Sequence, residues 1–242
     1  MGLLSFLKKK TEKPPVLAAV VLAAGGSTRM GGEDKQKMLL DGLPVLARTL
    51  LAFQQCASVS KIVVVTRPES MVFVQDICRE WSIDKVGEIV SGGATRRESS
   101  LAGVKAAGEC DYIAIHDGAR PLVTPDLITR VFAAAQQHKA AIPGVAVSDT
   151  IKRVDKRLAH GDLPPRDLLV AVQTPQVFDA TLIRGALAAA DDSREYTDDA
   201  SVVEAMGMSV FVTDGDERNI KITRPSDLAV AEALLEFEEG EL

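Results

Sequence analysis

The chain has 242 residues, of which 46% are hydrophobic and 26% are charged. These proportions are typical of a folded globular protein rather than a disordered one, and the length suits one α/β domain or two small ones. The formal net charge of −6 argues against a large surface for nucleic acid or for an anionic membrane, although local basic residues can still bind a small anion.

The three cysteines, Cys56, Cys78 and Cys110, are scattered and without any C-x-x-C spacing. This pattern indicates free thiols in a reducing compartment and argues against a disulfide framework or a zinc site. No apolar run approaches the roughly 18 residues that a membrane span requires. We therefore expect a cytoplasmic protein that binds no membrane.

The N-terminal segment "MGLLSFLKKKTEKPP" carries its basic residues after its short apolar stretch. A signal peptide has the reverse order, and no small-residue cleavage site follows. We expect residues 1–15 to form a flexible N-terminal extension.

Apolar segments typical of buried strands alternate with segments of helical spacing through the first two thirds of the chain. The predicted strands are residues 17–23, 61–66, 86–92, 111–117 and 140–147. The predicted helices are residues 44–56, 69–81, 97–107 and 124–138. Continuous apolar strands separated by amphipathic helices predict an α/β fold with a mainly parallel central sheet, flanked by helices on both faces.

The alternation stops at Ser148. From there to Gln173 two β-like pieces flank a polar segment with Gly161 and two prolines, which predicts a projecting β-hairpin arm over residues 148–173. The remaining predicted elements are helices at residues 179–190 and 198–206, a strand at 209–214 and a final helix at 225–238. Without a repeat or a linker, we expect a single domain over residues 16–242.

Polar segments follow the predicted strands. The first strand is followed by "AAGGSTRMGGEDK", the third by "SGGATRRES", the fourth by "HDGARP" and the fifth by "SDTIKR", and later come "QTPQ" and "RNIKIT". Ligands of parallel α/β sheets bind at the carboxyl ends of the strands. We therefore expect several basic and small polar residues to converge on one edge of the sheet.

The first of these loops is dense in glycine. It lacks the G-x-x-x-x-G-K-[ST] spacing of a P-loop, and Ser27 stands where the second glycine of a G-x-G-x-x-G fingerprint would follow Gly25. What remains is a glycine-rich backbone with Arg29 and Lys35, which can bind a polyphosphate through amide donors and two cations. An ordinary surface loop is the alternative interpretation.

The same loop resembles the L-A-A-G-x-G-x-R-M…K signature of nucleotidyltransferases with a Rossmann-like fold. "HDGARP", "DTIKR", "QTPQ", "TDDAS" and "NIKIT" follow in the order of the motifs of the 2-C-methyl-D-erythritol 4-phosphate cytidylyltransferases. The resemblance extends from about Leu17 to Leu235. It implies a single Rossmann-like domain.

The activity that the resemblance implies is cytidylyl transfer from CTP to 2-C-methyl-D-erythritol 4-phosphate in the non-mevalonate isoprenoid route. The products are 4-diphosphocytidyl-2-C-methyl-D-erythritol and pyrophosphate. Ribitol 5-phosphate or another polyol phosphate is an alternative acceptor on the same scaffold. A non-catalytic nucleotide-binding relative is an alternative from another class.

The resemblance also implies roles for individual residues. Arg29, Lys35, Arg166 and Lys221 would be the catalytic cations. The nucleotide would be bound by Ala23, Ala24, Gly25, Gly26, Gly92, Gly93, Ser99 and Asp117. The acceptor would be held by Asp117, Arg120, Thr150, Arg166, Thr174, Thr197 and Lys221. Arg166 lies on the predicted arm, which in this family completes the partner's site, so the resemblance implies a homodimer.

The sequence departs from the family pattern at three places. Ser27 replaces the second glycine of the signature, which costs some backbone freedom but keeps a small side chain. The stretch from Arg29 to Lys35 is one residue shorter than usual, which leaves Lys37 as an alternative to Lys35, although the spacing from Lys35 to Pro44 favours Lys35. Ala94 follows the second glycine pair where the family often has an acidic residue. A polar contact to the base is therefore absent or replaced.

The chemistry itself needs cations rather than a catalytic base. The nucleophile is a phosphate monoester with a second pKa near 6, so it is largely ionised at neutral pH. The obstacle is to bring two anions together and to stabilise the departing pyrophosphate. We expect Mg²⁺ as the cofactor, bound mainly through the phosphates of CTP, and we assign no metal ligand to the protein.

Overall fold

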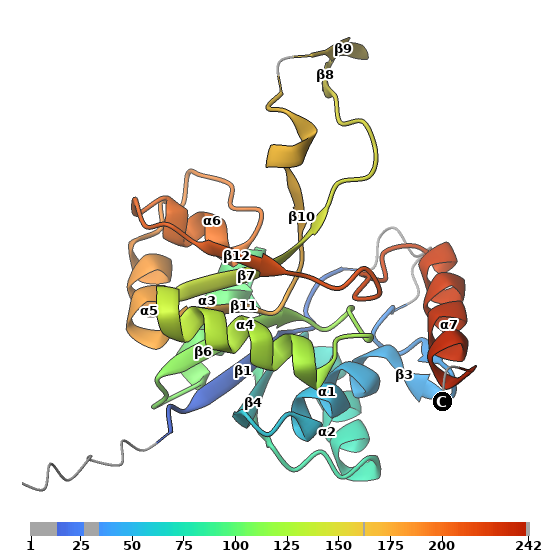
Figure 1. Ribbon diagram of the computed structural model, residues 1–242. Helices are drawn as coiled ribbons and strands as arrows, with labels where there is room; N and C mark the ends of the chain where they lie inside the picture. Colours follow the sequence, from blue (N-terminus) through green and yellow to red (C-terminus); the bar gives the residue numbers. More distant parts are fainter. Residues whose placement is uncertain (1–13, 27–33, 162, 241–242) are drawn as a thin grey trace, which may run out of the picture.

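The computed structural model describes residues 14–26, 34–161 and 163–240. A central eight-stranded sheet lies between two layers of helices, and an arm projects from it (Figure 1). The strand order is β10-β7-β11-β6-β1-β4-β5, and β12 pairs with β7. The predicted α/β fold with a mainly parallel sheet is confirmed.

The N-terminal part of the chain forms one half of the sheet, which consists of four parallel strands. They are β1 (Leu17–Leu22), β4 (Val59–Thr66), β5 (Val86–Ser91) and β6 (Tyr112–Asp117). β1 lies between β4 and β6 and is buried along almost its whole length. A strand covered on both faces needs apolar residues at every position, which is why "LAAVVL" shows no alternation.

The other half of the sheet is mixed. It contains β7 (Ala140–Ala146), β10 (Val170–Val172), β11 (Gln176–Asp179) and β12 (Phe211–Asp214). β11 lies between β6 and β7 and is antiparallel to both, and β10 is antiparallel to β7. β11 was not among the predicted strands: "QVFD" is too short to show a period before the helix that follows it.

Helices cover both faces of the sheet. The helices are α1 (Val45–Gln55), α2 (Met71–Glu80), α3 (Arg96–Ala106), α4 (Pro125–His138), α5 (Ala180–Ala189), α6 (Asp199–Glu204) and α7 (Pro225–Gly240), with 3₁₀ turns η2 (Pro68–Ser70) and η3 (Arg166–Leu168). Side chains of α1, α2 and α4 pack with Leu17, Ala19 and Val21, whereas those of α3, α5 and α6 pack with Ala18 and Val20. Alternate residues of β1 thus serve the two faces.

A short hairpin that the sequence reading missed lies between the first glycine loop and α1. Its strands are β2 (Leu39–Leu40) and β3 (Leu43–Pro44). Asp41 and Gly42 connect them with φ values of 48° and 74°, the positive angles that a tight Asp-Gly hairpin turn requires. Leu40 packs with Ile222 and Ala231, so the hairpin joins α7 to the body.

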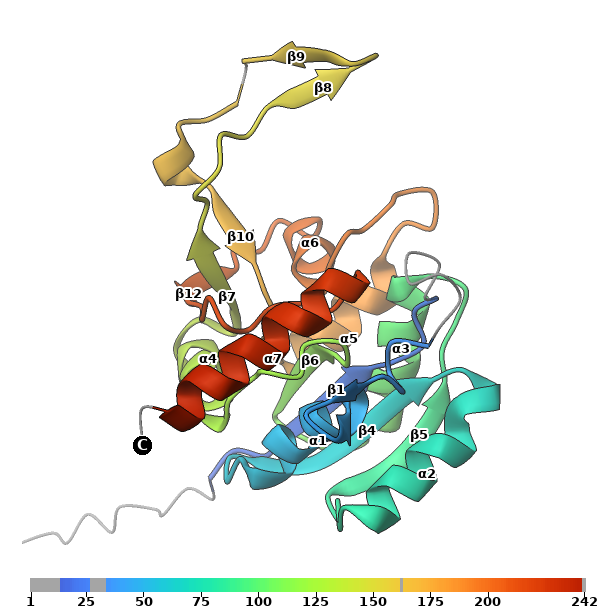
Figure 2. The same cartoon turned by 90° about the vertical axis from the view of Figure 1, so that its right-hand side faces the viewer.

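The predicted arm is present and extends away from the body (Figures 1 and 2). Its tip is a hairpin of β8 (Arg153–Asp155) and β9 (Leu158–His160). Large apolar side chains on the arm face solvent in the single chain: Leu158 is 69% exposed and Leu168 72%. The last strand of the predicted arm, β10, pairs with β7 and belongs to the main sheet.

Candidate active site

A cavity of about 300 Å³ lies at the carboxyl ends of the parallel strands, where the polar loops were expected to meet. Among its lining residues are Ala24, Gly25, Gly26, Gly93 and Ser99 from the two glycine loops. Its charged lining residues are Lys35, Arg96, Asp117 and Lys221. The structure therefore brings eight of the predicted site residues to one cavity.

The two glycine loops approach each other closely at Gly92. A β-carbon at this position would lie 2.5 Å from the β-carbon of Ala24 and 2.8 Å from the Ser99 hydroxyl oxygen. Contacts this short exclude any side chain at position 92. Gly92 does not line the cavity itself, but its lack of a side chain lets the two loops approach each other. Ala23 is likewise buried behind the cavity, with its N–H donated to the Val65 carbonyl at 2.7 Å.

The second glycine loop ends in a capping box that begins α3. The Thr95 hydroxyl accepts from the Glu98 N–H at 3.1 Å, and the Glu98 carboxylate accepts from the N–H groups of Thr95 and Ala94. The carboxylate nearest to Ala94 thus belongs to the helix cap. The Ser99 hydroxyl donates to the Thr95 carbonyl and accepts from the Gly93 N–H, so it orders the same loop.

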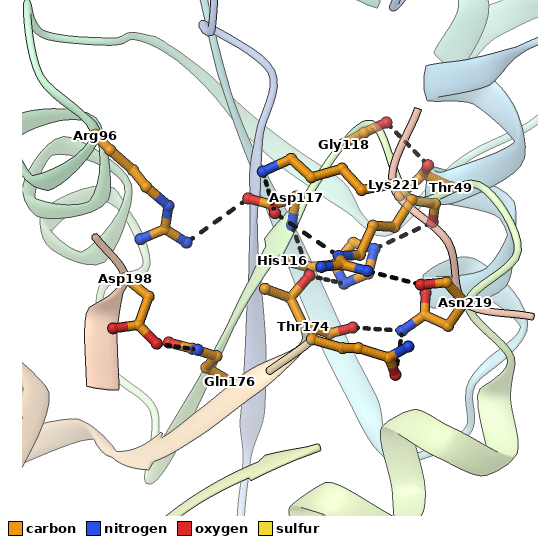
Figure 3. Close-up of polar contacts among 12 residues, drawn as sticks. Thr49, Arg96, His116, Asp117, Gly118, Thr174, Gln176, Asp198, Asn219 and Lys221 are labelled. Carbon is orange, nitrogen blue, oxygen red and sulfur yellow. Dashed lines mark hydrogen bonds and ion pairs between the residues drawn. The ribbon is translucent and has the colours of Figure 1, made fainter. Parts of the chain in front are cut away.

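Asp117, the last residue of β6, lies at the centre of the charged groups (Figure 3). Its carboxylate is 2.8 Å from Lys221 Nζ, 3.6 Å from Arg96 Nη2 and 3.8 Å from Arg120 Nε. Burial raises the pKa of the Asp117 carboxyl, but the charges of Lys221 and Arg96 outweigh burial and hold that pKa well below its usual range. Asp117 is therefore an anion with three cationic side chains around it, of which Arg96 and Lys221 line the cavity.

Arg96 is a site residue that the sequence reading missed. Its Nη1 lies 2.5 Å from Asp199 Oδ2, at the start of α6, so one guanidinium joins Asp117 to Asp199. Asp199 is buried, and this burial raises the pKa of its carboxyl while Arg96 opposes the rise. Arg96 follows Gly93 by three residues on a loop already assigned to the site, and this position in the sequence could have identified it.

Thr174 and His116 face each other beside Asp117 (Figure 3). The Thr174 side chain is 4% exposed, and its hydroxyl lies 3.0 Å from His116 Nδ1. The His116 ring is fully buried against Phe53, and burial lowers the pKa of His116 to about 3. His116 is thus a packed, neutral residue.

The remaining predicted residues lie elsewhere. Thr150 and Arg166 line a separate cavity of about 250 Å³ within the arm, and Thr197 is exposed on the loop before α6. Arg120 is beside Asp117 but is not among the lining residues. Arg29 lies outside the described residues, as do all of residues 27–33.

The two candidate lysines differ in position. Lys35 lines the cavity, whereas Lys37 is exposed and its Nζ lies 5.3 Å from the centre of the Phe73 ring, on α2. The ring attracts the Lys37 ammonium group, and Lys37 is not among the residues that line the cavity. Of the two candidate lysines, the structure therefore brings Lys35 to the cavity.

The cavity, the loops and the arm can be set beside known proteins. A model of the family described as "IspD: 2-C-methyl-D-erythritol 4-phosphate cytidylyltransferase" matches residues 17–237. The chain belongs to this family. It is therefore a nucleotidyltransferase, and the resemblance carried by the six sequence motifs is confirmed at the level of the family.

Proteins of the same name are similar over most of their length. The one from Geobacter metallireducens is 42% identical over 214 residues, which cover 86% of this chain and 92% of the relative. The one from Halalkalibacterium halodurans is 42% identical over 205 residues, which cover 84% and 90%. The chain thus spans nearly the whole of each relative.

Solved structures agree in fold. A crystal structure of 4-diphosphocytidyl-2C-methyl-D-erythritol synthase from Anaerococcus prevotii matches with a TM-score of 0.81 at 29% identity, covering 92% of this chain and 97% of that one. A 2-C-methyl-D-erythritol 4-phosphate cytidylyltransferase from Thermus thermophilus matches with a TM-score of 0.74 at 33% identity, covering 90% and 98%.

The described part of the chain contains neither a helix that could span a membrane nor a cluster of metal-ligating side chains. No helix there is long and apolar enough to cross a membrane. No group of three or more histidine, cysteine, aspartate or glutamate side chains there is arranged to hold a metal ion.

Proposed function

We propose that this enzyme transfers the cytidylyl group of CTP to 2-C-methyl-D-erythritol 4-phosphate and releases pyrophosphate. The observation that carries the proposal is the cavity, which is lined by both glycine loops, by Lys35, and by Arg96 and Lys221 paired with Asp117. Exposed backbone amides and cations are what a triphosphate requires. Membership of the family indicates CTP and 2-C-methyl-D-erythritol 4-phosphate as the two substrates.

The reaction is a substitution at the α-phosphorus of CTP. A phosphate oxygen of the acceptor forms the new bond, and the bond between the α-phosphorus and the oxygen that bridges to the β-phosphorus breaks. The electron pair of that bond leaves with pyrophosphate. Because the acceptor phosphate is ionised at neutral pH, the protein contributes position and positive charge rather than a base.

The nucleotide side of the cavity would be the two glycine loops. Gly25, Gly26 and Gly93 line the cavity and would offer backbone N–H groups to the triphosphate, and Lys35, with Arg29 from the neighbouring stretch, would bind its phosphates. Lys221 and Asp117 stand at the opposite wall, beside Arg120, where the acceptor phosphate would meet the α-phosphorus. Thr197 would contribute to the acceptor side.

The residues around the cavity fit a Mg²⁺ ion that is held mainly by the ligand. Asp117 is the only carboxylate among the described lining residues, and its oxygens already face Lys221 and Arg96. A protein cage is therefore not available here, whereas the phosphates of CTP offer hard oxygen ligands. The ion, when bound, would neutralise phosphate charge, and Asp117 is the protein oxygen that could approach it.

Free thiols at Cys56, Cys78 and Cys110 support a cytoplasmic location, because a reducing compartment keeps cysteines unpaired.

We propose further that the enzyme is a homodimer in which each arm completes the other subunit's site. Arg166 and Thr150 lie in the arm, apart from the cavity of their own chain, and the apolar side chains of the arm are exposed. A projecting apolar arm is stabilised when a second copy covers it.

Mixing two inactive variants tests the trans arrangement. We expect Arg166→Ala and Lys35→Ala each to be nearly inactive, and their mixture after subunit exchange to regain about a quarter of the wild-type rate. The reason is that half of the dimers would be mixed, and each would contain one site with both residues intact. Each variant exchanged with itself is the control. No regain in the mixture, with exchange shown by mass, would place Arg166 in its own chain's site.

The acceptor is tested by pyrophosphate release from CTP. We expect turnover with 2-C-methyl-D-erythritol 4-phosphate, and a kcat/KM with ribitol 5-phosphate lower by at least about 100-fold, because the site must pair polar groups of one particular polyol. Faster turnover with ribitol 5-phosphate would reassign the acceptor. Binding of CTP without turnover of either acceptor would favour the nucleotide-binding relative.

A further inference from the structure

Two residues are inserted in the edge that faces β7. Val172 of β10 pairs with Gly144, and Val177 of β11 pairs with Ala141. The chain therefore advances five residues from Val172 to Val177, while β7 advances only three between their partners. The insertion interrupts the edge between β10 and β11. Gln173 and Thr174, at its start, are buried.

Four hydrogen bonds close a ring at this point, which we call the Thr174 ring. Its members are His116, Arg120, Asn219 and Thr174. The Thr174 hydroxyl is 3.0 Å from His116 Nδ1, and His116 Nε2 is 3.3 Å from the Arg120 carbonyl oxygen. Arg120 Nη1 donates to the Asn219 carbonyl at 2.7 Å, and Asn219 Nδ2 donates to the Thr174 carbonyl at 2.8 Å.

The direction of each bond in the ring is fixed by its acceptors. The Arg120 carbonyl can only accept, so the His116 proton is on Nε2. Since burial keeps His116 neutral, its Nδ1 has no proton and must accept from the Thr174 hydroxyl. The Thr174 oxygen in turn accepts from the Asp117 N–H at 3.1 Å. The only hydroxyl proton of Thr174 is therefore used within the protein.

The ring holds the two segments that carry Asp117 and Lys221. Asp117 follows His116 directly and is bonded to Thr174 through its N–H. Lys221 follows Asn219 by two residues, and the Ile222 N–H between these segments donates to the Ala119 carbonyl at 2.8 Å.

Gln173 anchors the start of the segment that carries Lys221. Its side-chain amide donates to the Asp216 carbonyl at 2.8 Å, and its side-chain oxygen accepts from the Asp216 N–H at 3.1 Å. The end of β6, which carries Asp117, and the loop between β12 and α7, which carries Lys221, are thus both hydrogen-bonded to the insertion, and their charged groups lie 2.8 Å apart.

We propose that His116, Asn219 and the Thr174 hydroxyl are positioning residues for the reaction, which set the Lys221–Asp117 pair before substrate binds. None of the three groups needs to touch a substrate: His116 and Asn219 are fully buried, and the hydroxyl proton of Thr174 points to His116. The proposal deepens the proposed cytidylyl transfer and rests on it. In this proposal Thr174 holds Asp117 in position and does not bind the acceptor substrate, which is the role that the family resemblance implies for it.

Kinetics of ring variants test the role. We expect His116→Leu and Thr174→Val to lower kcat by about 10- to 100-fold, with the KM for CTP within about twofold of wild type, because Lys221 and Asp117 shift while the glycine loops do not. Thr174→Ser keeps the hydroxyl and should stay within about threefold of wild type. His116→Asn keeps an acceptor near the Nδ1 position and should be less impaired than His116→Leu.

A variant that weakens the fold elsewhere is the control. Asp179→Ala removes the N-cap of α5, whose Oδ1 accepts from the Leu182 N–H at 3.0 Å, and should leave kcat unchanged. If His116→Leu and Thr174→Val resembled Asp179→Ala, with lower Tm and wild-type kcat, the ring would be structural only. If Thr174→Val greatly lowered kcat while His116→Leu kept a wild-type kcat, the Thr174 hydroxyl would bind the acceptor substrate and would not be a positioning group.

The tautomer of His116 gives a readout that needs no substrate. NMR chemical shifts of the imidazole nitrogens should show a proton on Nε2 and none on Nδ1, and Thr174→Val should move the Nδ1 shift while Thr174→Ser should not. A protonated Nδ1 would overturn the ring. If the wild type turned over another polyol phosphate, the proposed acceptor would fail, and the same variants measured with that acceptor would still decide the ring.

Discussion

Replacing Lys35 with alanine is expected to lower kcat by about 100- to 1,000-fold, whereas Lys37→Ala should leave kcat within about twofold of wild type. Loss of one preorganised stabilising group at a site where charge develops typically has an effect of this size. Lys35 lines the cavity, and Lys37 lies over Phe73 outside it. Steady-state pyrophosphate release with saturating CTP and acceptor measures the difference.

The two lysines are a matched pair, since they are two residues apart and carry the same charge. If both variants had a lower Tm, the loop would contribute to the stability of the fold. This result would not affect the comparison of the two kcat values. If Lys37→Ala abolished turnover and Lys35→Ala did not, the shortened spacing of the first glycine loop would have shifted the working lysine, and our assignment would be wrong.

Arg96→Met is expected to lower the free energy of unfolding by about 3 kcal/mol, because it leaves the buried Asp199 carboxylate without its cation. The neighbouring Arg97→Met is the control: Arg97 pairs with Asp192, whose side chain is 85% exposed, and exposed pairs contribute less than about 1 kcal/mol. Urea denaturation at pH 7.5 compares the two.

A second substitution separates the charge from the loss of packing. Arg96→Met with Asp199→Asn should recover much of the loss, because no unpaired buried charge remains. The deficit of Arg96→Met should also shrink as the pH falls. Burial already raises the pKa of Asp199, and loss of Arg96 raises it further, so the folded variant binds a proton that the unfolded chain does not. A deficit that is constant with pH and unchanged by Asp199→Asn would assign it to packing alone.

Much of the architecture could be predicted because its strands and helices carry strong local signals. β1 is an unbroken apolar run between two glycine- or proline-containing segments, and α4 has a Thr-Pro start with apolar residues at helical spacing. These signals depend on neighbours within a few residues of each other. The short elements were missed for the opposite reason: β11 is four residues long and is a strand because β6 and β7 lie on either side of it.

The candidate site divides in the same way. By itself, the sequence determined the family, the glycine loops and the charged residues after the strands, because a binding loop keeps its residue types at fixed spacing. Only the tertiary structure decided that Arg96 joins Asp117 to Asp199 and that Thr174 turns toward His116. Those contacts join residues 103 and 58 positions apart along the chain. Their partners are chosen by the packing of the sheet and by the two-residue insertion before β11, which no local pattern encodes.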